Sequence, residues 1–227
     1  MCGRYVLMAS PRQLQETYRA TLTMELSDHR AAYNVCPTHQ MPVVMESADE
    51  RTVRSCRWGL IPRWARSASD VPLMINARSE TLAEKPSFRE PFRTQRCVVP
   101  ANGFYEWQTS SEGKLPWYIT PRQEELMSIA GLYEIWNSGE ESIVSYTIIT
   151  TEATGEFRDL HHRIPAILSG PQIDLWLDPE TSDPDQLQPL LHPTPAETLD
   201  IYRVSRRVNS PANQDPSLID PEPDLFS

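Results

Sequence analysis

The chain has 227 residues, of which 39% are hydrophobic and 23% are charged, and its formal net charge is −10. This composition is typical of a globular protein with one domain, and no apolar run approaches the roughly 18–20 residues that a membrane span needs. No signal peptide is visible, so we expect a cytoplasmic protein, nucleoid-associated if bacterial. None of the four cysteines forms a Cys-x-x-Cys pair, and we predict neither a metal nor another cofactor.

The charge is unevenly distributed along the chain. Residues 171–227 hold eleven acids and three arginines, a net of −8, which leaves −2 for residues 1–170. Residues 51–96 carry ten bases, nine of them arginine, against four acids, a net of +6. Arginine suits bidentate contacts with phosphates, and a local basic surface binds phosphates even on an acidic protein. A solvated, salt-bridged face is the alternative, and charge alone does not decide between the two.

At the start of the chain, Cys2 directly follows the initiator methionine. Removal of Met1 would leave one residue with a free α-amine, of ordinary pKa about 7.7–8.0, and a thiol of ordinary pKa about 8.5. Such a 1,2-aminothiol condenses with an aldehyde first to an imine and then to a five-membered thiazolidine ring, which an internal cysteine cannot form. For an isolated Met-Cys pair, an accident of the start site would be the better explanation.

The first hundred residues are predicted to contain short strands and few helices. Ser10 and Pro11 are an N-cap and first-turn pair that begins a helix ending near Ala20. Strands are expected at residues 3–8, 42–47 and 52–58. Residues 21–40 are predicted to be irregular with an ordered centre at 33–38, and short helical turns are expected after Asn76 and at 87–92.

The stretch between Trp58 and Trp64 is predicted to be a loop because Gly59 and Pro62 interrupt it. Two indoles bracket this loop, and we expect at least one of them to be buried. A partly exposed indole beside Arg63 would form a surface on which a nucleic-acid base can stack.

Strands dominate the second half of the chain. They are predicted at residues 97–99, 104–108, 117–120, 127–134, 142–151 and 166–168, with short helices at 155–163, 171–177 and 185–191. This clustering indicates an α+β fold with a mostly antiparallel, barrel-like β-sheet core and peripheral short helices. We expect a single domain over residues 1–210 and a Pro-rich, acidic C-terminal tail, 211–227, that is loosely packed or disordered.

Four residues stand in distinctive contexts: Cys2, Asn76 in Asn-Ala-Arg-Ser-Glu, Glu106 in Gly-Phe-Tyr-Glu-Trp and His161 in His-His-Arg-Ile-Pro. Each alone has a commoner explanation, such as a helix cap for the Asn or a surface position for the Glu. Together with Trp-Gly-Leu-Ile-Pro at 58–62 and Val-Ser-x-x-Val-Asn at 204–209, they make the chain resemble the SRAP (SOS response-associated peptidase) family over almost its whole length.

The resemblance implies a DNA damage response protein that senses abasic sites in single-stranded DNA, including sites at junctions with double-stranded DNA. It implies a covalent thiazolidine DNA–protein crosslink through the α-amine and thiol of Cys2, which shields the lesion. Met1 would be removed by self-processing or by an aminopeptidase. The protein would thus be an enzyme with a covalent Cys nucleophile, peptidase-like toward its own N-terminus and lyase-like in its Schiff-base chemistry, acting as a monomer without a membrane.

The resemblance also assigns roles to individual residues. We expect Glu106 to accept a proton from the α-ammonium of Cys2, and His161 to protonate the opened sugar or the leaving hydroxyl. Asn76 would hold the thiol or the sugar by hydrogen bonds. The DNA contacts implied are phosphates for Arg4, Arg78 and Arg163, and the kinked strand for Asn34, Pro37 and Trp64.

The sequence departs from the family pattern at two places. Ala65 follows Trp64 where some bacterial members have a second Trp, which would weaken a wedge between bases. Cys36 replaces a commoner Ala before Pro37, either as a second thiol near the site or as a packed side chain.

Two other functions stay open on the sequence. Glutamine amidotransferases also begin Met-Cys-Gly and use the Cys thiol with its own α-amine as base, although their remaining motifs are not visible in this chain. A non-covalent reader of modified bases in DNA would use the same basic surface without covalent chemistry.

Overall fold

Strand pairing divides the protein into a closed barrel and an open sheet. The structure is a computed structural model that describes residues 2–111, 113–139 and 141–222. The barrel closes because β11 pairs with β10 in the antiparallel sense on one side and with β5 in the parallel sense on the other. In order around the ring, the barrel strands are β11 (Ser142–Glu152), β10 (Met127–Asn137), β7 (Arg96–Ala101), β4 (Gln40–Glu46) and β5 (Arg51–Trp58).

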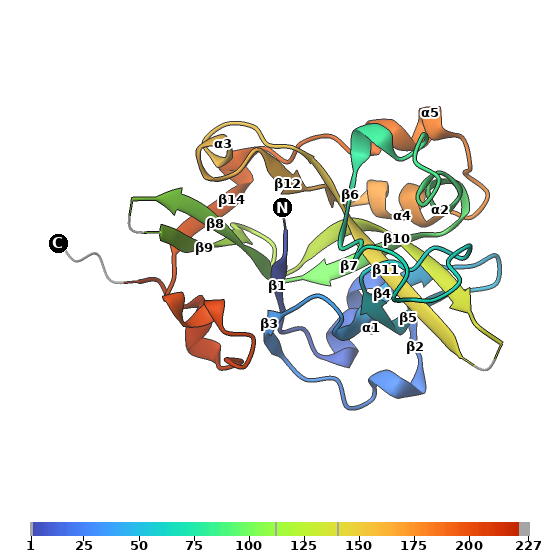
Figure 1. The fold of residues 1–227 in the computed structure, drawn as a ribbon, viewed down its shortest axis with the longest axis horizontal. Coiled ribbons are helices and arrows are strands. Elements are labelled where there is room, and N and C mark those ends of the chain that lie inside the picture. The colour runs from blue at the N-terminus through green and yellow to red at the C-terminus, as the bar shows by residue number, and fades with distance from the viewer. Residues whose placement is uncertain (1, 112, 140, 223–227) are drawn as a thin grey trace.

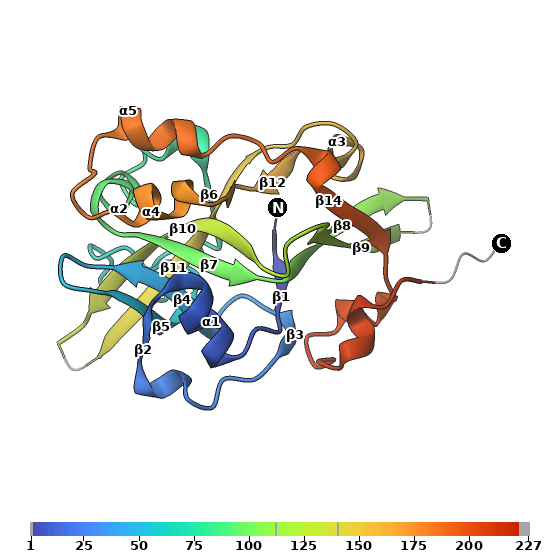
Figure 2. The same cartoon turned by 180° about the vertical axis from the view of Figure 1, so that it is seen from behind.

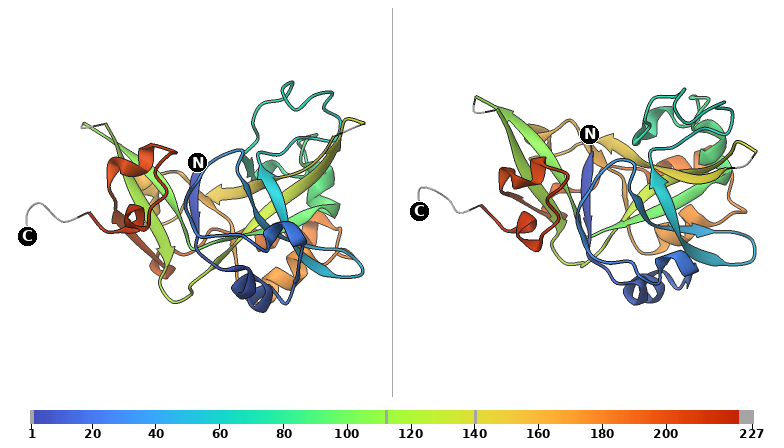
Figure 3. Two further views of the ribbon diagram at one scale, coloured as in Figure 1. Left: turned by 90° about the horizontal axis from the view of Figure 1, so that it is seen from below. Right: turned by 60° about the horizontal axis from the view of Figure 1, so that its bottom comes forward.

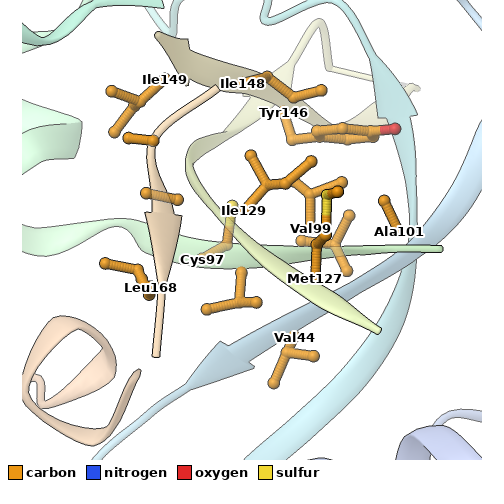
Figure 4. Close-up of a cluster of buried hydrophobic side chains, with 14 of the residues drawn as sticks. Val44, Cys97, Val99, Ala101, Met127, Ile129, Tyr146, Ile148, Ile149 and Leu168 are labelled. Atoms are coloured by element: carbon orange, nitrogen blue, oxygen red, sulfur yellow. The ribbon is translucent and has the colours of Figure 1, made fainter. Parts of the chain in front are cut away.

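The barrel interior is an apolar core. Every residue of β7 is buried, and so are seven consecutive residues of β11, because other segments of the chain cover the outer faces of these strands. Val99, Ile129 and Ile148, from three different strands, gather in one cluster inside the ring (Figure 4).

The open sheet lies beside the barrel, with β1 at the junction of the two (Figures 1 and 2). β1 pairs in the antiparallel sense with β8 and with β3. The stretch at residues 21–40, predicted to be irregular around an ordered centre, is ordered there as the strand β3, which depends on this pairing. The strands in sheet order are β14 (Leu199–Arg203), β9 (Gly113–Pro121), β8 (Gly103–Ser110), β1 (Arg4–Leu7) and β3 (Ala32–Val35).

Helices and short strands surround these two sheets. The Ser10 hydroxyl accepts a hydrogen bond from the Gln13 backbone N–H at 3.3 Å, and the Gln13 side chain accepts one from the Ser10 N–H at 2.8 Å. This capping box begins the first helix where the sequence predicts it. The helices are α1 (Pro11–Tyr18), α2 (Arg89–Thr94), α3 (Phe157–Leu160), α4 (Pro171–Leu177) and α5 (Pro184–Leu187), with 3-10 turns η1 (Met24–Leu26), η2 (Ser79–Thr81), η3 (Gln188–Leu190), η4 (Ala196–Thr198), η5 (Arg206–Asn209) and η6 (Pro216–Ile219); the short strands are β2 (Thr21–Leu22), β6 (Asn76–Arg78), β12 (Arg163–Pro165) and β13 (Ile167–Leu168).

The predicted fold class is confirmed. The sheets are mostly antiparallel, one of them closes into a barrel, and the helices are short and peripheral. Within the described ranges, no helix is long and apolar enough to cross a bilayer.

The end of the described chain packs tightly, although the sequence predicts a loose tail after Ser210. We call residues 204–222 the C-terminal segment; it lies beside the open sheet (Figure 3). Leu218 is fully buried in a cluster with Val6 and Tyr105, and Arg207 pairs with Asp215 at 2.7 Å. Composition alone misses these long-range contacts. The rest of the predicted tail, 223–227, lies outside the described residues.

Candidate functional site

Cys2 lies just before β1, and its side chain is almost fully buried, with 1% exposed. Its Sγ is 3.9 Å from the backbone oxygen of Arg4. Burial, together with the negative charge of Glu106, raises the pKa of the Cys2 thiol to about 12. The thiol is therefore protonated at neutral pH, and it has to lose that proton before or while its sulfur forms a bond.

Asn76 fixes the backbone of Cys2. It lies on β6, where Asn76 pairs with Ile148 of β11, so the barrel wall holds it in place. Its Nδ2 donates a hydrogen bond to the Cys2 carbonyl oxygen at 2.8 Å. Its Oδ1 is buried and, among the described residues, has no hydrogen-bond partner. The amide thus orients Cys2 and keeps one acceptor unused, which is uncommon for a buried polar atom.

Aromatic packing brings Glu106 and His161 together. Phe104 of β8 and Phe157 of α3 lie with ring centroids 6.0 Å apart, which holds α3 against the strand that carries Glu106. The helix ends at His161, whose backbone N–H donates to the Phe157 carbonyl at 2.9 Å. As a result, His161 Nδ1 lies 4.0 Å from Glu106 Oε2.

Two backbone groups of Arg163 meet the His161 ring. Nδ1 lies 2.9 Å from the Arg163 N–H, which it accepts when Nδ1 is unprotonated, and 3.2 Å from the Arg163 carbonyl oxygen, to which it donates when Nδ1 carries a proton. Burial lowers the pKa of His161, and the nearby Glu106 carboxylate offsets part of this effect. The neutral ring therefore predominates at neutral pH.

A pocket of about 520 Å³ opens over Glu106 and His161, whereas Cys2 and Asn76 are not among its lining residues. The Trp107 indole N–H donates to Asn209 Oδ1 at 2.8 Å, which ties β8 to η5 at the pocket wall. The sequence places Trp107 and Asn209 in recognisable motifs but assigns them no role, and it gives no signal for Lys114, which the β8–β9 hairpin brings to the rim. The lining residues are Gly3, Arg4, Glu106, Trp107, Thr109, Lys114, His161 and Asn209.

Three predicted DNA contacts have accessible side chains. Trp64 is 58% exposed, whereas Trp58 is fully buried, in line with the expectation that at least one indole is internal. Arg78 is exposed, and because it lies two residues after Asn76 on β6 it shares that strand face. Pro37 is half-buried in the turn after β3.

Two other predicted contacts are internal. Arg163 makes a bidentate ion pair with Glu80, with both N–O distances 2.9 Å, and its side chain is 7% exposed. Asn34 is completely buried. A direct contact with DNA requires an accessible side chain, and in this structure neither residue offers one. The family pattern identifies these positions, but it does not show whether their side chains are exposed or buried.

Only some of the basic side chains of residues 51–96 are free to form a basic surface. Arg51 pairs with Glu46 at 2.6 Å, and Arg63 pairs with Glu134 at 3.0 Å. Arg96 is buried and donates to backbone carbonyls, including that of Trp176 at 2.6 Å. The salt-bridged alternative thus accounts for part of this charge. No group of three or more His, Cys, Asp or Glu side chains able to hold a metal occurs in the described part of the chain.

The fold and the site together define the class of protein. The chain matches the family described as SOS response associated peptidase (SRAP) over residues 1–211, and it belongs to that family. It is 39% identical over 222 residues to the abasic site processing protein YoqW of Bacillus subtilis, covering 97% of this chain and 99% of that protein. It is also 34% identical over 226 residues to the abasic site processing protein HMCES of Gallus gallus, covering 85% of this chain and 67% of that protein.

A solved structure shares the fold. The crystal structure of a Bacteroides thetaiotaomicron protein, 31% identical in sequence, superposes with a TM-score of 0.87 and covers 97% of this chain and 100% of that one.

Proposed function

We propose that this protein recognises abasic sites in single-stranded DNA and captures them as a thiazolidine crosslink through Cys2. The relatives named abasic site processing proteins support the substrate. The observation that carries the chemistry is the environment of Cys2, whose carbonyl oxygen accepts a hydrogen bond from Asn76 at 2.8 Å and whose thiol pKa is raised in part by the charge of Glu106. Removal of Met1 activates the site because it converts the Cys2 nitrogen from an amide into an amine.

The proposed reaction is a condensation. The Cys2 amine adds to the C1′ aldehyde of the ring-opened abasic sugar and gives a carbinolamine, which loses water to form an imine. The Cys2 sulfur then bonds to the imine carbon, and the thiol proton ends on the nitrogen. The products are a thiazolidine and one water molecule, and no oxidant or reductant is needed.

The thiol pKa sets the order of these steps. Burial raises that pKa to about 12, whereas a free α-amine has an ordinary pKa of about 7.7–8.0. Near neutral pH the amine is therefore the nucleophile that reacts first, and the thiol reacts only after the imine has formed. Ring closure then removes the thiol proton as the imine nitrogen becomes basic.

Glu106 and His161 supply the proton transfers. Glu106 accepts a proton from the α-ammonium, which makes the amine nucleophilic. His161 lines the pocket, where it would donate a proton to the sugar oxygen and, when protonated, to the leaving hydroxyl. The unused Oδ1 of Asn76 is a ready acceptor for an N–H of the freed amine.

Damage selectivity comes from the missing base. A nucleotide without a base does not stack, so bending the strand and extruding its sugar costs less there than elsewhere. Arg4 and Lys114 line the pocket, and Arg78 and Trp64 are exposed at the surface. These side chains would hold the flanking phosphates and bases, including at junctions with double-stranded DNA.

The test is covalent capture of abasic single-stranded DNA. Purified protein is incubated with the DNA and run on a denaturing gel. We expect a heat-stable shifted band for the wild type, none for Cys2→Ala, and none with a tetrahydrofuran abasic analogue that lacks the aldehyde. Cys36→Ala is the matched control, since Cys36 is also a buried free cysteine, and it should crosslink normally.

The rival functions give different results. Binding without a covalent band, unchanged in Cys2→Ala, would indicate a reader of DNA and overturn the proposal. Release of ammonia from glutamine, abolished in Cys2→Ala, would indicate an amidohydrolase instead.

A further inference from the structure

Asn34 links Arg4 to the C-terminal segment. Its Oδ1 accepts a hydrogen bond from Arg4 Nη1 at 2.7 Å. Its Nδ2 lies within hydrogen-bond distance of the backbone carbonyls of Val208, Ser210 and Asn213, at 3.2, 3.0 and 3.0 Å. The side chain is fully buried, so these contacts form without competition from water.

The orientation of the amide is fixed by its neighbours. The guanidinium of Arg4 can only donate, and carbonyl oxygens can only accept. Rotating the amide by 180° would place its oxygen against the carbonyls and its N–H groups against the arginine. Asparagine meets both requirements in one short side chain, and neither alanine nor aspartate does.

Arg4 is thereby held on one edge only. Its Nη1 also donates to the Val208 carbonyl at 3.0 Å, whereas its Nε and Nη2 have no hydrogen bond within the part of the chain that the structure describes. Arg4 lines the pocket together with Glu106 and His161. The anchored edge sets the direction of the guanidinium, and the other edge stays available for a ligand.

We propose that Asn34 is a positioning residue for Arg4, and that the C-terminal segment contributes to the DNA site by fixing Asn34. This inference rests on the proposed function. An unanchored arginine loses much side-chain freedom when it binds a phosphate, and an anchor formed during folding removes that cost from DNA binding. Asn34 therefore acts on DNA through Arg4 and does not touch it.

The test is a double-mutant cycle on non-covalent binding, measured with single-stranded abasic DNA in the Cys2→Ala background. Arg4→Ala should weaken binding about tenfold, which is typical for the loss of a hydrogen bond to a charged group. Asn34→Ala should weaken it by a similar factor, and the double variant should bind no worse than Arg4→Ala. The slope of log K against log salt should fall by about 0.7 in each case, the value for one phosphate on a single strand.

Pro37→Ala is the matched control, because Pro37 lies near Asn34 in the chain but is half-buried at the surface. The change in binding free energy caused by Pro37→Ala should add to the change caused by Arg4→Ala. Each variant is assayed well below its own melting temperature. If Asn34→Ala does not fold, Asn34→Gln replaces it, since this variant keeps the amide but moves it by one methylene.

The outcomes separate two failures. Effects of Arg4→Ala and Asn34→Ala that multiply would show that Asn34 acts independently, and would overturn this inference while the proposed function stands. An Arg4→Ala variant with wild-type affinity and wild-type salt slope would overturn the inference together with the predicted phosphate contact of Arg4.

Discussion

Replacing Asn76 with alanine should separate DNA binding from crosslinking. The substitution removes the 2.8 Å hydrogen bond to the Cys2 carbonyl and leaves that oxygen without its amide donor. Losing one partner of a buried hydrogen bond costs about 1–3 kcal/mol, which corresponds to about a 5- to 150-fold smaller population of correctly placed Cys2. We expect the crosslinking rate to fall by that factor while non-covalent affinity for abasic DNA stays unchanged.

The assay is the single-turnover appearance of the covalent band, with protein in excess over DNA. Mass spectrometry of each preparation must show that Met1 is absent, because a processing defect would also slow capture. Asn137→Ala, at the exposed end of β10, is the matched control and should react like the wild type. A fully processed Asn76→Ala protein that crosslinks at the wild-type rate would refute the assigned role of Asn76.

Three further variants test other parts of the site. The proposed reaction needs a free Cys2 amine and a protonated His161, whose pKa burial lowers. The wild-type crosslinking rate should therefore rise with pH up to the His161 pKa, stay level to about pH 8, where the amine is fully free, and fall above it; a pH–rate profile of His161→Gln that keeps the alkaline fall would contradict this. Glu80→Gln leaves the Arg163 charge without its carboxylate, so urea unfolding at neutral pH should show a loss of about 1–2 kcal/mol. Partial burial alone raises the pKa of Glu80, but Arg163 holds it below its usual value. The difference in unfolding free energy between wild type and Glu80→Gln should therefore be lost progressively as the pH falls below about 4.3. A difference that persists at low pH would be evidence against the ion pair as its cause. Trp107→Phe removes the indole N–H that bonds Asn209 and should weaken DNA binding about 2- to 10-fold, as measured by fluorescence anisotropy; unchanged affinity would exclude a role for this bond in the pocket wall.

Much of the fold can be predicted from local patterns. Alternating and continuous apolar runs identify the long strands, with ends that differ from the observed ones by a few residues, as for β10 and β11. The pair Ser10 and Pro11 marks the start of α1. These features depend on residues that are close together in the chain, so they can be predicted from the sequence alone.

The candidate site residues are connected by a different kind of information. Cys2, Asn76 and Glu106 come from β1, β6 and β8 or their ends, and His161 follows α3, so no local pattern connects them. The family resemblance supplies the connection, and the structure brings Asn76 to Cys2 and Glu106 to His161.

What the sequence does not predict depends on long-range burial. Asn34 bonds to carbonyls more than 170 residues away, and Arg163 pairs with Glu80 across 83 residues. Composition identifies the C-terminal segment as acidic and Pro-rich, but its packing depends on Leu218 reaching a pocket formed by the open sheet. Polar residues and prolines in such positions resemble exposed residues until their partners are known.

The central claim is that a free Cys2 N-terminus captures the abasic aldehyde. Intact mass spectrometry of the crosslinked product, followed by peptide mapping, tests it most directly. The account predicts a product equal in mass to protein lacking Met1 plus DNA minus one water, joined at Cys2, and none from a chain in which an extra residue precedes Cys2, although that chain still binds DNA. A crosslink that maps to a lysine, or that forms equally well with Cys2 blocked by a preceding residue, would contradict it.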